Sequence, residues 1–169
     1  MTNSVGSSLG ITIKSEREIN LMRKSGVVTN NVKQLLRETI NSGMTTSDID
    51  VIAENQIRSE GAIPAFKGLY GFPATVCSSI NEEIVHGIPG KRVLLDGDIL
   101  SIDVGSIVEG YYSDSAFTMG IGSIKQKSVD LIQTTYDSLI VGIKEVKPGA
   151  RIGDISSAIQ QFAENSGYS

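Results

Sequence analysis

Two aspartates, Asp103 and Asp114, lie on opposite arms of a predicted β-hairpin whose tight turn is Val108–Gly110. The first arm alternates apolar and polar residues, which is typical of a strand with one buried face. If Ile107 pairs with Gly110 across a two-residue loop, the two aspartates become direct cross-strand partners. Like charges in such a pair destabilise a sheet. The pattern therefore indicates either a slack strand register or a cation that is held between the two carboxylates.

A metal ion is the chemistry that two facing carboxylates suggest. Hard and borderline divalent metals accept carboxylate oxygens, and two-metal hydrolytic sites use bridging carboxylates. The alternative is that one aspartate points to solvent and that the turn is one residue longer. The spacing alone leaves both interpretations open.

The composition is that of an ordinary globular protein, because 40% of the 169 residues are hydrophobic and 20% are charged. A net charge of −4 without a cluster of Lys and Arg argues against direct nucleic-acid binding. No segment approaches the roughly 20 apolar residues that span a membrane, and the N-terminus lacks the basic and apolar regions of a secretory signal. We therefore expect a cytoplasmic protein without a membrane partner, in which residues 1–12 form a flexible leader.

Helical periodicity predicts two helices before the hairpin and two after it. Capping residues and glycine breaks set their ends. In chain order, the helices are predicted at residues 16–40 after a capping box at Ser15, between a Thr46 or Ser47 cap and Gly61, from Gly122 to about Glu145, and from about Gly153 to Gly167.

The two helices after the hairpin repeat the two before it. With a shift of 106 residues, Ile40, Gly43, Asp48, Ile49, Ala53 and Gly61 fall on Val146, Gly149, Asp154, Ile155, Ile159 and Gly167. Six matches in one register favour a duplication, so the chain reads as one and a half units of a two-unit fold. The second pair then lacks a sheet to cover, and we expect incompletely buried side chains there, namely Ile132, Leu139, Ile143, Ile155, Ile159 and Phe162.

His86 is the only histidine and Cys77 the only cysteine. A lone histidine in a segment with Gly and Pro is more often a loop residue than a catalyst, but this segment leads directly into the strand that carries Asp103. A nucleophilic pair of Cys77 and His86 is a further interpretation, although a buried structural cysteine is commoner. A single cysteine allows no internal disulfide, which fits a reducing compartment.

Three segments closely resemble type I methionine aminopeptidases. They are residues 72–89 (FPATVCSSINEEIVHGIP), 96–105 (DGDILSIDVG) and 111–115 (YYSDS), and the resemblance runs from about Ile13 to the last residue. It implies an α+β pita-bread fold, with a first αβ unit over about 13–122 and the helices of a second, incomplete unit over about 123–169. It also implies metal-dependent removal of the initiator methionine, with nascent polypeptide N-termini as substrate and the ribosome as a candidate partner.

The resemblance assigns roles to single residues. It implies that two divalent ions (cobalt, manganese, iron, nickel or zinc) bind the hairpin aspartates and that a catalytic histidine contacts the peptide. It also implies a pocket for the methionine side chain. The residues carried over are Asp103 and Asp114 for the metal, His86 for catalysis and substrate binding, Phe66, Phe72 and Cys77 for the pocket, and Tyr70 close by.

Departures from the family pattern set limits on these expectations. The remaining metal ligands of the family, one histidine and two glutamates, lie beyond Ser169, so residues 1–169 alone are expected to be inactive. Ser101 stands where many relatives have asparagine, and Leu69 where an aromatic is common. Two alternatives stay open: a non-catalytic pita-bread binding module, and another metallopeptidase of the same fold, such as one that cleaves before proline.

Overall fold

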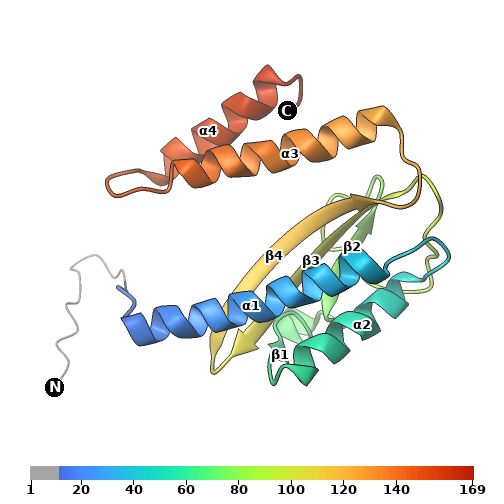
Figure 1. Cartoon of the computed structure of the whole chain (residues 1–169), viewed down its shortest axis with the longest axis horizontal. Helices are drawn as coiled ribbons and strands as arrows, with labels where there is room; N and C mark the ends of the chain where they lie inside the picture. The colour runs from blue at the N-terminus through green and yellow to red at the C-terminus, as the bar shows by residue number, and fades with distance from the viewer. Residues whose placement is uncertain (1–11) are drawn as a thin grey trace.

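The computed structural model describes residues 12–169, so all but the last residue of the leader predicted at 1–12 lies outside the described part. The four predicted helices are confirmed, each within a few residues of its expected ends. In chain order the elements are α1 (Glu16–Thr39), α2 (Thr46–Ser59), β1 (Ile63–Pro64), the 3₁₀ turn η1 (Leu69–Gly71), β2 (Val76–Ile80), β3 (Ile99–Val108), β4 (Tyr111–Gly120), α3 (Gln126–Lys144) and α4 (Ile152–Asn165) (Figure 1).

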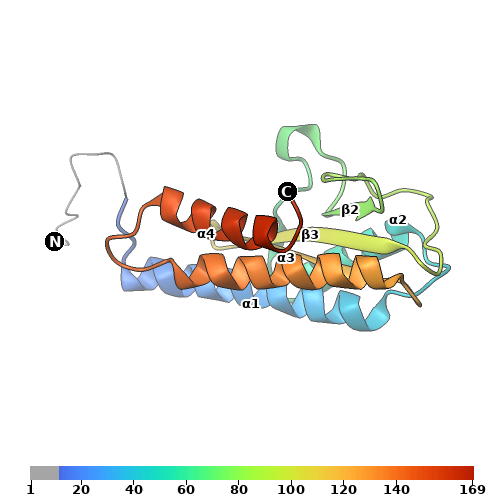
Figure 2. The same ribbon diagram turned by 90° about the horizontal axis from the view of Figure 1, so that it is seen from above.

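An antiparallel sheet centred on β3 organises the first part of the chain. β4 pairs along the whole of one side of β3, whereas β1 and β2 pair with successive parts of its other side. α1 and α2 cover one face of this sheet (Figures 1 and 2). The predicted alternation on β3 is confirmed, since Leu100, Ile102 and Val104 are all fully buried beneath the helices.

The predicted register of the hairpin is wrong. Asp114 lies opposite Gly105, and Asp103 lies opposite Ala116. The turn consists of Glu109 and Gly110 alone, with φ of 49° and 83°; both central residues of a type I′ hairpin turn need positive φ, which glycine accepts readily. A β-branched residue such as Val108 resists that conformation and stays in the strand instead.

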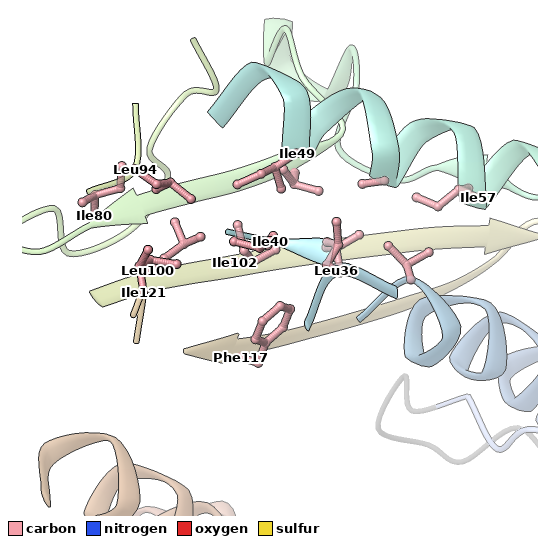
Figure 3. Close-up of a cluster of buried hydrophobic side chains, with 14 of the residues drawn as sticks. Leu36, Ile40, Ile49, Ile57, Ile80, Leu94, Leu100, Ile102, Phe117 and Ile121 are labelled. Carbon is pink, nitrogen blue, oxygen red and sulfur yellow. The ribbon is translucent and has the colours of Figure 1, made fainter. Parts of the chain in front are cut away.

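The core forms where the sheet meets α1 and α2, as Figure 3 shows for its largest side chains. Leu36 of α1 and Ile49 and Ile57 of α2 are fully buried there. Full burial of such a side chain contributes about 1.5–3 kcal/mol. The core therefore anchors the sheet from behind, which leaves the opposite face of β3 available for a site.

Local capping explains where the helices begin. The predicted capping box is confirmed at Ser15, whose hydroxyl accepts from the backbone N–H of Glu18 while that residue's carboxylate accepts from Ser15 N. The cap of α2 is Thr45, not Thr46 or Ser47 as predicted, because Asp48 completes a capping box with Thr45. Sequence spacing alone did not distinguish three consecutive hydroxyl or cap-forming candidates.

The helical repeat is visible in the structure at the predicted shift of 106 residues. Both bounds of α4 equal those of α2 moved by that shift. Gly43 and Gly149 precede the two helices with φ of 91° and 88°, and Gly61 and Gly167 follow them with φ of 74° and 83°. Such φ values favour glycine, so the same breaks shape both helix pairs.

α3 and α4 pack on each other and lie beyond the β4 edge of the sheet (Figure 1). Gly142 allows the close approach, because a Cβ there would lie 2.7 Å from Ile159. As expected, apolar side chains of this pair are incompletely covered: Leu139 is 52% and Ile143 is 55% exposed. Among residues 12–169, no helix has both the length and the apolar character that crossing a membrane requires.

Candidate active site

A cavity of about 580 Å³ lies on the face of the sheet that α1 and α2 leave uncovered. Side chains from four segments meet in its wall: the loop around η1, β2, the loop after β2, and the β3–β4 hairpin. Every site residue carried over from the sequence resemblance lines this cavity, namely Phe66, Tyr70, Phe72, Cys77, His86, Asp103 and Asp114. The site residues are far apart in sequence, and the fold brings them together.

Asp103 and Asp114 come together although they are not direct partners. Asp114 lies opposite Gly105, which stands two residues after Asp103 on the same face of β3. Because Gly105 has no side chain, the diagonal pair of carboxyl groups is close enough to share a hydrogen bond. Both residues line the cavity, in which Asp103 is half-buried and Asp114 is exposed.

The environment of Asp103 disfavours the charged form of its carboxyl group. Burial, a hydrogen bond that the protonated Asp103 donates to Asp114, and the charge of Asp114 together raise the pKa of Asp103 from 3.8 to about 6, while nearby His86 acts in the opposite direction. A cation between the carboxylates would relieve this cost. The hairpin thus brings together two carboxyl groups, one of which has a raised pKa.

The raised pKa predicts a pH-dependent effect of Asp103→Asn. The folded state binds more protons than the unfolded state between pH 3.8 and about 6, so stability falls as pH rises through this window and stays lower above it. The asparagine variant should therefore be more stable than the parent without metal at pH 7.5, by about 0.2–1 kcal/mol, and the gain should shrink at pH 4.5. Urea unfolding at both pH values measures it.

Asp98, at the start of the same hairpin, is the matched control for this prediction. A hydrogen bond from the backbone of Leu95 and another from Asn81 lower the pKa of Asp98, which is the opposite direction. Asp98→Asn should therefore destabilise the protein at pH 7.5. Equal effects of the two asparagine variants would show that Asp103 and Asp114 do not repel each other.

The loop after β2 carries His86 to the mouth of the cavity. Ser78 N donates to Gly87 O at 2.8 Å, and Gly87 N donates to Ser79 Oγ at 3.2 Å, so the loop folds back along β2. A Cβ at Gly87 would lie 2.1 Å from Ser78 O, so only glycine permits this approach. His86 itself is exposed and has φ of 59°, an uncommon conformation for a residue with a side chain.

The loop around η1 forms the apolar wall. Ala65 N donates to Gly105 O at 3.0 Å, which ties the start of this loop to β3 beside the aspartates. A Cβ at Gly105 would lie 3.0 Å from the Phe66 ring, so the missing side chain also makes room for that ring. Tyr70 is fully exposed with φ of 50°, and it stands at the rim of the cavity.

Cys77 lies opposite Asp103 on β2 and faces the cavity. Burial, followed by the charges of Asp103 and Asp114, raises the pKa of the Cys77 thiol to about 11. The thiol is therefore protonated near neutral pH, whereas a nucleophilic cysteine needs a lowered pKa. The interpretation of Cys77 and His86 as a nucleophilic pair is wrong, and the thiol acts as a small apolar group.

The residues present suit part of a metal site. Two carboxylates supply the oxygen ligands that hard and borderline divalent ions prefer. Within residues 12–169, no group of three or more His, Cys, Asp or Glu side chains is placed to hold a metal ion. The cavity therefore offers two ligands, and the further ligands that a tight site needs would have to come from outside these residues.

Sequence reasoning did not identify Gly87 and Gly105 as determinants of the site. Neither has the positive φ that marks a glycine needed for its backbone conformation. Both are required by the close approach of another segment, which is β2 at Gly87 and both β4 and the η1 loop at Gly105. In the sequence, only their positions indicated a role: Gly87 directly follows His86, and Gly105 stands two residues after Asp103.

Comparisons with known proteins agree with this geometry. Residues 20–169 match metallopeptidase family M24. Methionine aminopeptidase 1 of Bacillus subtilis and the methionine aminopeptidase of Clostridium perfringens are each 46% identical over 159 residues, which cover 94% of this chain and 64% of the relative. This chain therefore spans about 64% of the length of these curated relatives.

Solved structures share the fold. Methionine aminopeptidase from Rickettsia prowazekii superposes with a TM-score of 0.92 at 38% identity, covering 94% of this chain and 64% of the other. Prolidase from Pyrococcus furiosus has a TM-score of 0.83 at 21% identity, covering 92% and 45%, and supports the fold alone. The predicted α+β pita-bread fold and the resemblance to methionine aminopeptidases are thus confirmed.

Proposed function

Because this chain belongs to metallopeptidase family M24, we propose that it forms the N-terminal part of a methionine aminopeptidase, which removes the initiator methionine from new polypeptides. One observation carries the proposal: a carboxylate pair and an apolar wall line the same cavity. The carboxylates suit divalent ions, and the wall suits a methionine thioether. The 46% identity to proteins that bear this name supports the same activity.

Asp103 and Asp114 would hold a pair of divalent ions, with cobalt, manganese, iron, nickel and zinc as candidates. Such ions, when bound, supply a water of lowered pKa and polarise the scissile carbonyl. His86, which lies at the mouth beside Asp103, would donate a hydrogen bond to the peptide and stabilise the negative charge that develops on it. In this proposal the two aspartates bind the ions, and the histidine orients the peptide.

The apolar wall would select the N-terminal side chain. Phe66, Phe72 and Cys77 line the cavity next to the aspartates, with Tyr70 at the rim. Since the raised pKa of Cys77 keeps its thiol uncharged, this part of the cavity presents no charge to a thioether. An unbranched, polarisable side chain fits an irregular apolar pocket of this kind.

The assignment of units follows from the same proposal. Residues of about 13–122 form a first αβ unit, and those of about 123–169 supply the helices of a second unit. The remaining histidine and two glutamates would be contributed by chain beyond Ser169. The partners would be the N-termini of nascent polypeptides, in the cytoplasm, with the ribosome as a further candidate.

Two alternatives are less well supported. A non-catalytic binding module has no need of two like-charged carboxylates that line one cavity from adjacent strands. A peptidase that cleaves before proline shares the fold, but the prolidase likeness of 21% identity supports the fold alone. The methionine aminopeptidase relatives, at 46% identity, favour the first proposal.

Substrate selectivity tests the proposal. The chain is completed with the missing part of a methionine aminopeptidase relative, loaded with manganese or cobalt, and given three peptides: Met-Ala-Ser, Leu-Ala-Ser and Ala-Pro. Met-Ala-Ser should exceed the leucine peptide by about 10–200-fold in kcat/KM, the range that small side-chain differences allow in an apolar pocket. Faster cleavage of Ala-Pro would replace the proposal by the proline-directed alternative, and binding without cleavage would favour the binding module.

A further inference from the structure

Four hydroxyl groups meet on the helix-covered side of the hairpin, directly behind the candidate metal site. They belong to Ser25 and Thr29 of α1, Ser106 of β3 and Ser113 of β4, and we call them the hydroxyl cluster. Ser25, Thr29 and Ser106 are each no more than 1% exposed. Buried hydroxyls of this kind are costly unless every one has a partner.

Every member of the hydroxyl cluster has partners. Ser25 Oγ lies within hydrogen-bond distance, 2.9 Å, of both Ser106 O and Ser113 Oγ. Ser106 Oγ donates to Ser25 O at 3.0 Å and lies 3.1 Å from both Thr29 Oγ1 and Ser113 Oγ. Thr29 Oγ1 also hydrogen-bonds Ser113 Oγ. A fully satisfied buried network of this kind fixes one arrangement of the elements that it joins.

Ser113 is the residue directly before Asp114, so the two side chains point to opposite faces of β4. Ser113 Oγ is thus held by α1 and β3 behind the sheet, while Asp114 projects into the cavity in front of it. On the cavity side the two strands are also close, because a Cβ at Gly105 would lie 2.8 Å from Ser113 O. The β4 backbone at Ser113 is therefore held by the cluster on the helix side and by β3 at Gly105.

This constraint acts where the hairpin is under stress. Asp103 and Asp114 line the same cavity from adjacent strands, so negative charges on the two side chains repel each other. Within residues 12–169, β4 pairs only with β3, so no outer strand holds it in place. We propose that the hydroxyl cluster positions Asp114 beside Asp103. Ser113 is the member of the cluster that acts on Asp114, because it is the preceding residue of β4. The cluster's link to metal binding rests on the proposed function.

The chain offers a matched control on the other side of Asp114. Ser115 faces the same side of β4 as Ser113, but within residues 12–169 its hydroxyl has a single partner, Lys33 Nζ at 2.6 Å. Ser113→Ala and Ser115→Ala therefore make the same chemical change one residue away from Asp114 in either direction. Ser113→Ala should fold, because Ser25 and Thr29 still hydrogen-bond Ser106. Thr29→Val removes another cluster hydroxyl at constant shape, and the substituted residue lies in α1 rather than in β4.

Amide hydrogen exchange of the metal-free chain measures the positioning directly. Ser113→Ala and Thr29→Val should each speed exchange at the amides of residues 103–105 and 113–116 by about tenfold, because local opening becomes easier, while Ser115→Ala should change it by less than about twofold. Equal effects of the two alanine variants would overturn the proposal. So would a lower global stability with unchanged local exchange in Ser113→Ala, since that is the outcome of a purely structural cluster.

Manganese affinity of the same variants, followed by electron paramagnetic resonance, links the hydroxyl cluster to the proposed function. Affinity should fall by at least about fivefold in Ser113→Ala and Thr29→Val and by less than about twofold in Ser115→Ala, because misplaced ligands bind metal poorly. Because residues 12–169 offer only two metal ligands, this affinity is measured in the completed protein. A completed parent that binds no manganese would count against the metal-site proposal, whereas the exchange data would still decide the positioning role. Unchanged affinity in the cluster variants of a manganese-binding parent would overturn the link.

Discussion

A polypeptide of residues 1–169 is expected to release no measurable methionine from a Met-Ala-Ser peptide, whatever divalent metal is added. The same chain completed with the missing part of a relative should turn over at about 1–10³ s⁻¹, the usual range for enzymes. The reason is the ligand count. Within residues 12–169 only two carboxylates meet, and no group of three or more potential ligands is present, whereas tight metal sites need more ligands.

The control is the completed protein with Asp103→Asn, which should lose bound metal and turnover together. Metal content by elemental analysis and methionine release are measured on the same samples. The completing segment alone is assayed in parallel, so that activity can be assigned to the combination. Robust turnover by residues 1–169 alone would show that two carboxylates and His86 suffice, and it would contradict the account of the missing ligands.

The helices and the alternation of β3 could be predicted because their signals are local. The capping box at Ser15, the glycine breaks and the apolar periodicity each lie within a few residues of the element they define. The 106-residue repeat was equally accessible, since corresponding positions in the two helix pairs carry the same residue types. These features need no knowledge of which segments meet in space.

The hairpin register was harder to predict from the sequence, because it depends on which of several possible two-residue turns forms. The choice between Val108–Glu109 and Glu109–Gly110 is decided by φ, and Gly110 at 83° decides it. The two alternatives shift the pairing by two residues, so the aspartates keep the same face in both. For that reason the metal hypothesis was compatible with the observed fold even though the predicted partner of Asp114 was wrong.

Gly87, Gly105 and the hydroxyl cluster could not be predicted, because each depends on how separate elements pack against one another. Ser25 and Ser113 read as ordinary polar residues until α1 is seen to cross behind the hairpin. The positions of Gly87 and Gly105 reflect the space available, which a single sequence does not encode in any local pattern. Packing between elements therefore supplied the part of the site that residue types alone did not.

His86→Asn in the completed protein is expected to lower kcat/KM by about 10²–10⁴, the range for loss of a positioned acid–base or polarising group. His86 lines the cavity beside Asp103 but would bind substrate, not metal. Metal content should therefore be unchanged. Asparagine tests the imidazole more specifically than alanine does. His86 has φ of 59°, and asparagine tolerates this region far better than most residues.

Comparison of two substitutions separates chemistry from backbone strain. His86→Asn and His86→Ala both remove the imidazole. Alanine should also lower the free energy of unfolding, by about 1 kcal/mol, because it disfavours a positive φ more than asparagine does. Both variants should lose kcat/KM to a similar extent, whereas only the alanine variant should be clearly less stable in urea. If asparagine preserved activity and alanine did not, His86 would matter for the loop conformation rather than for the peptide. A large loss of bound metal in either variant would instead make His86 part of the metal site.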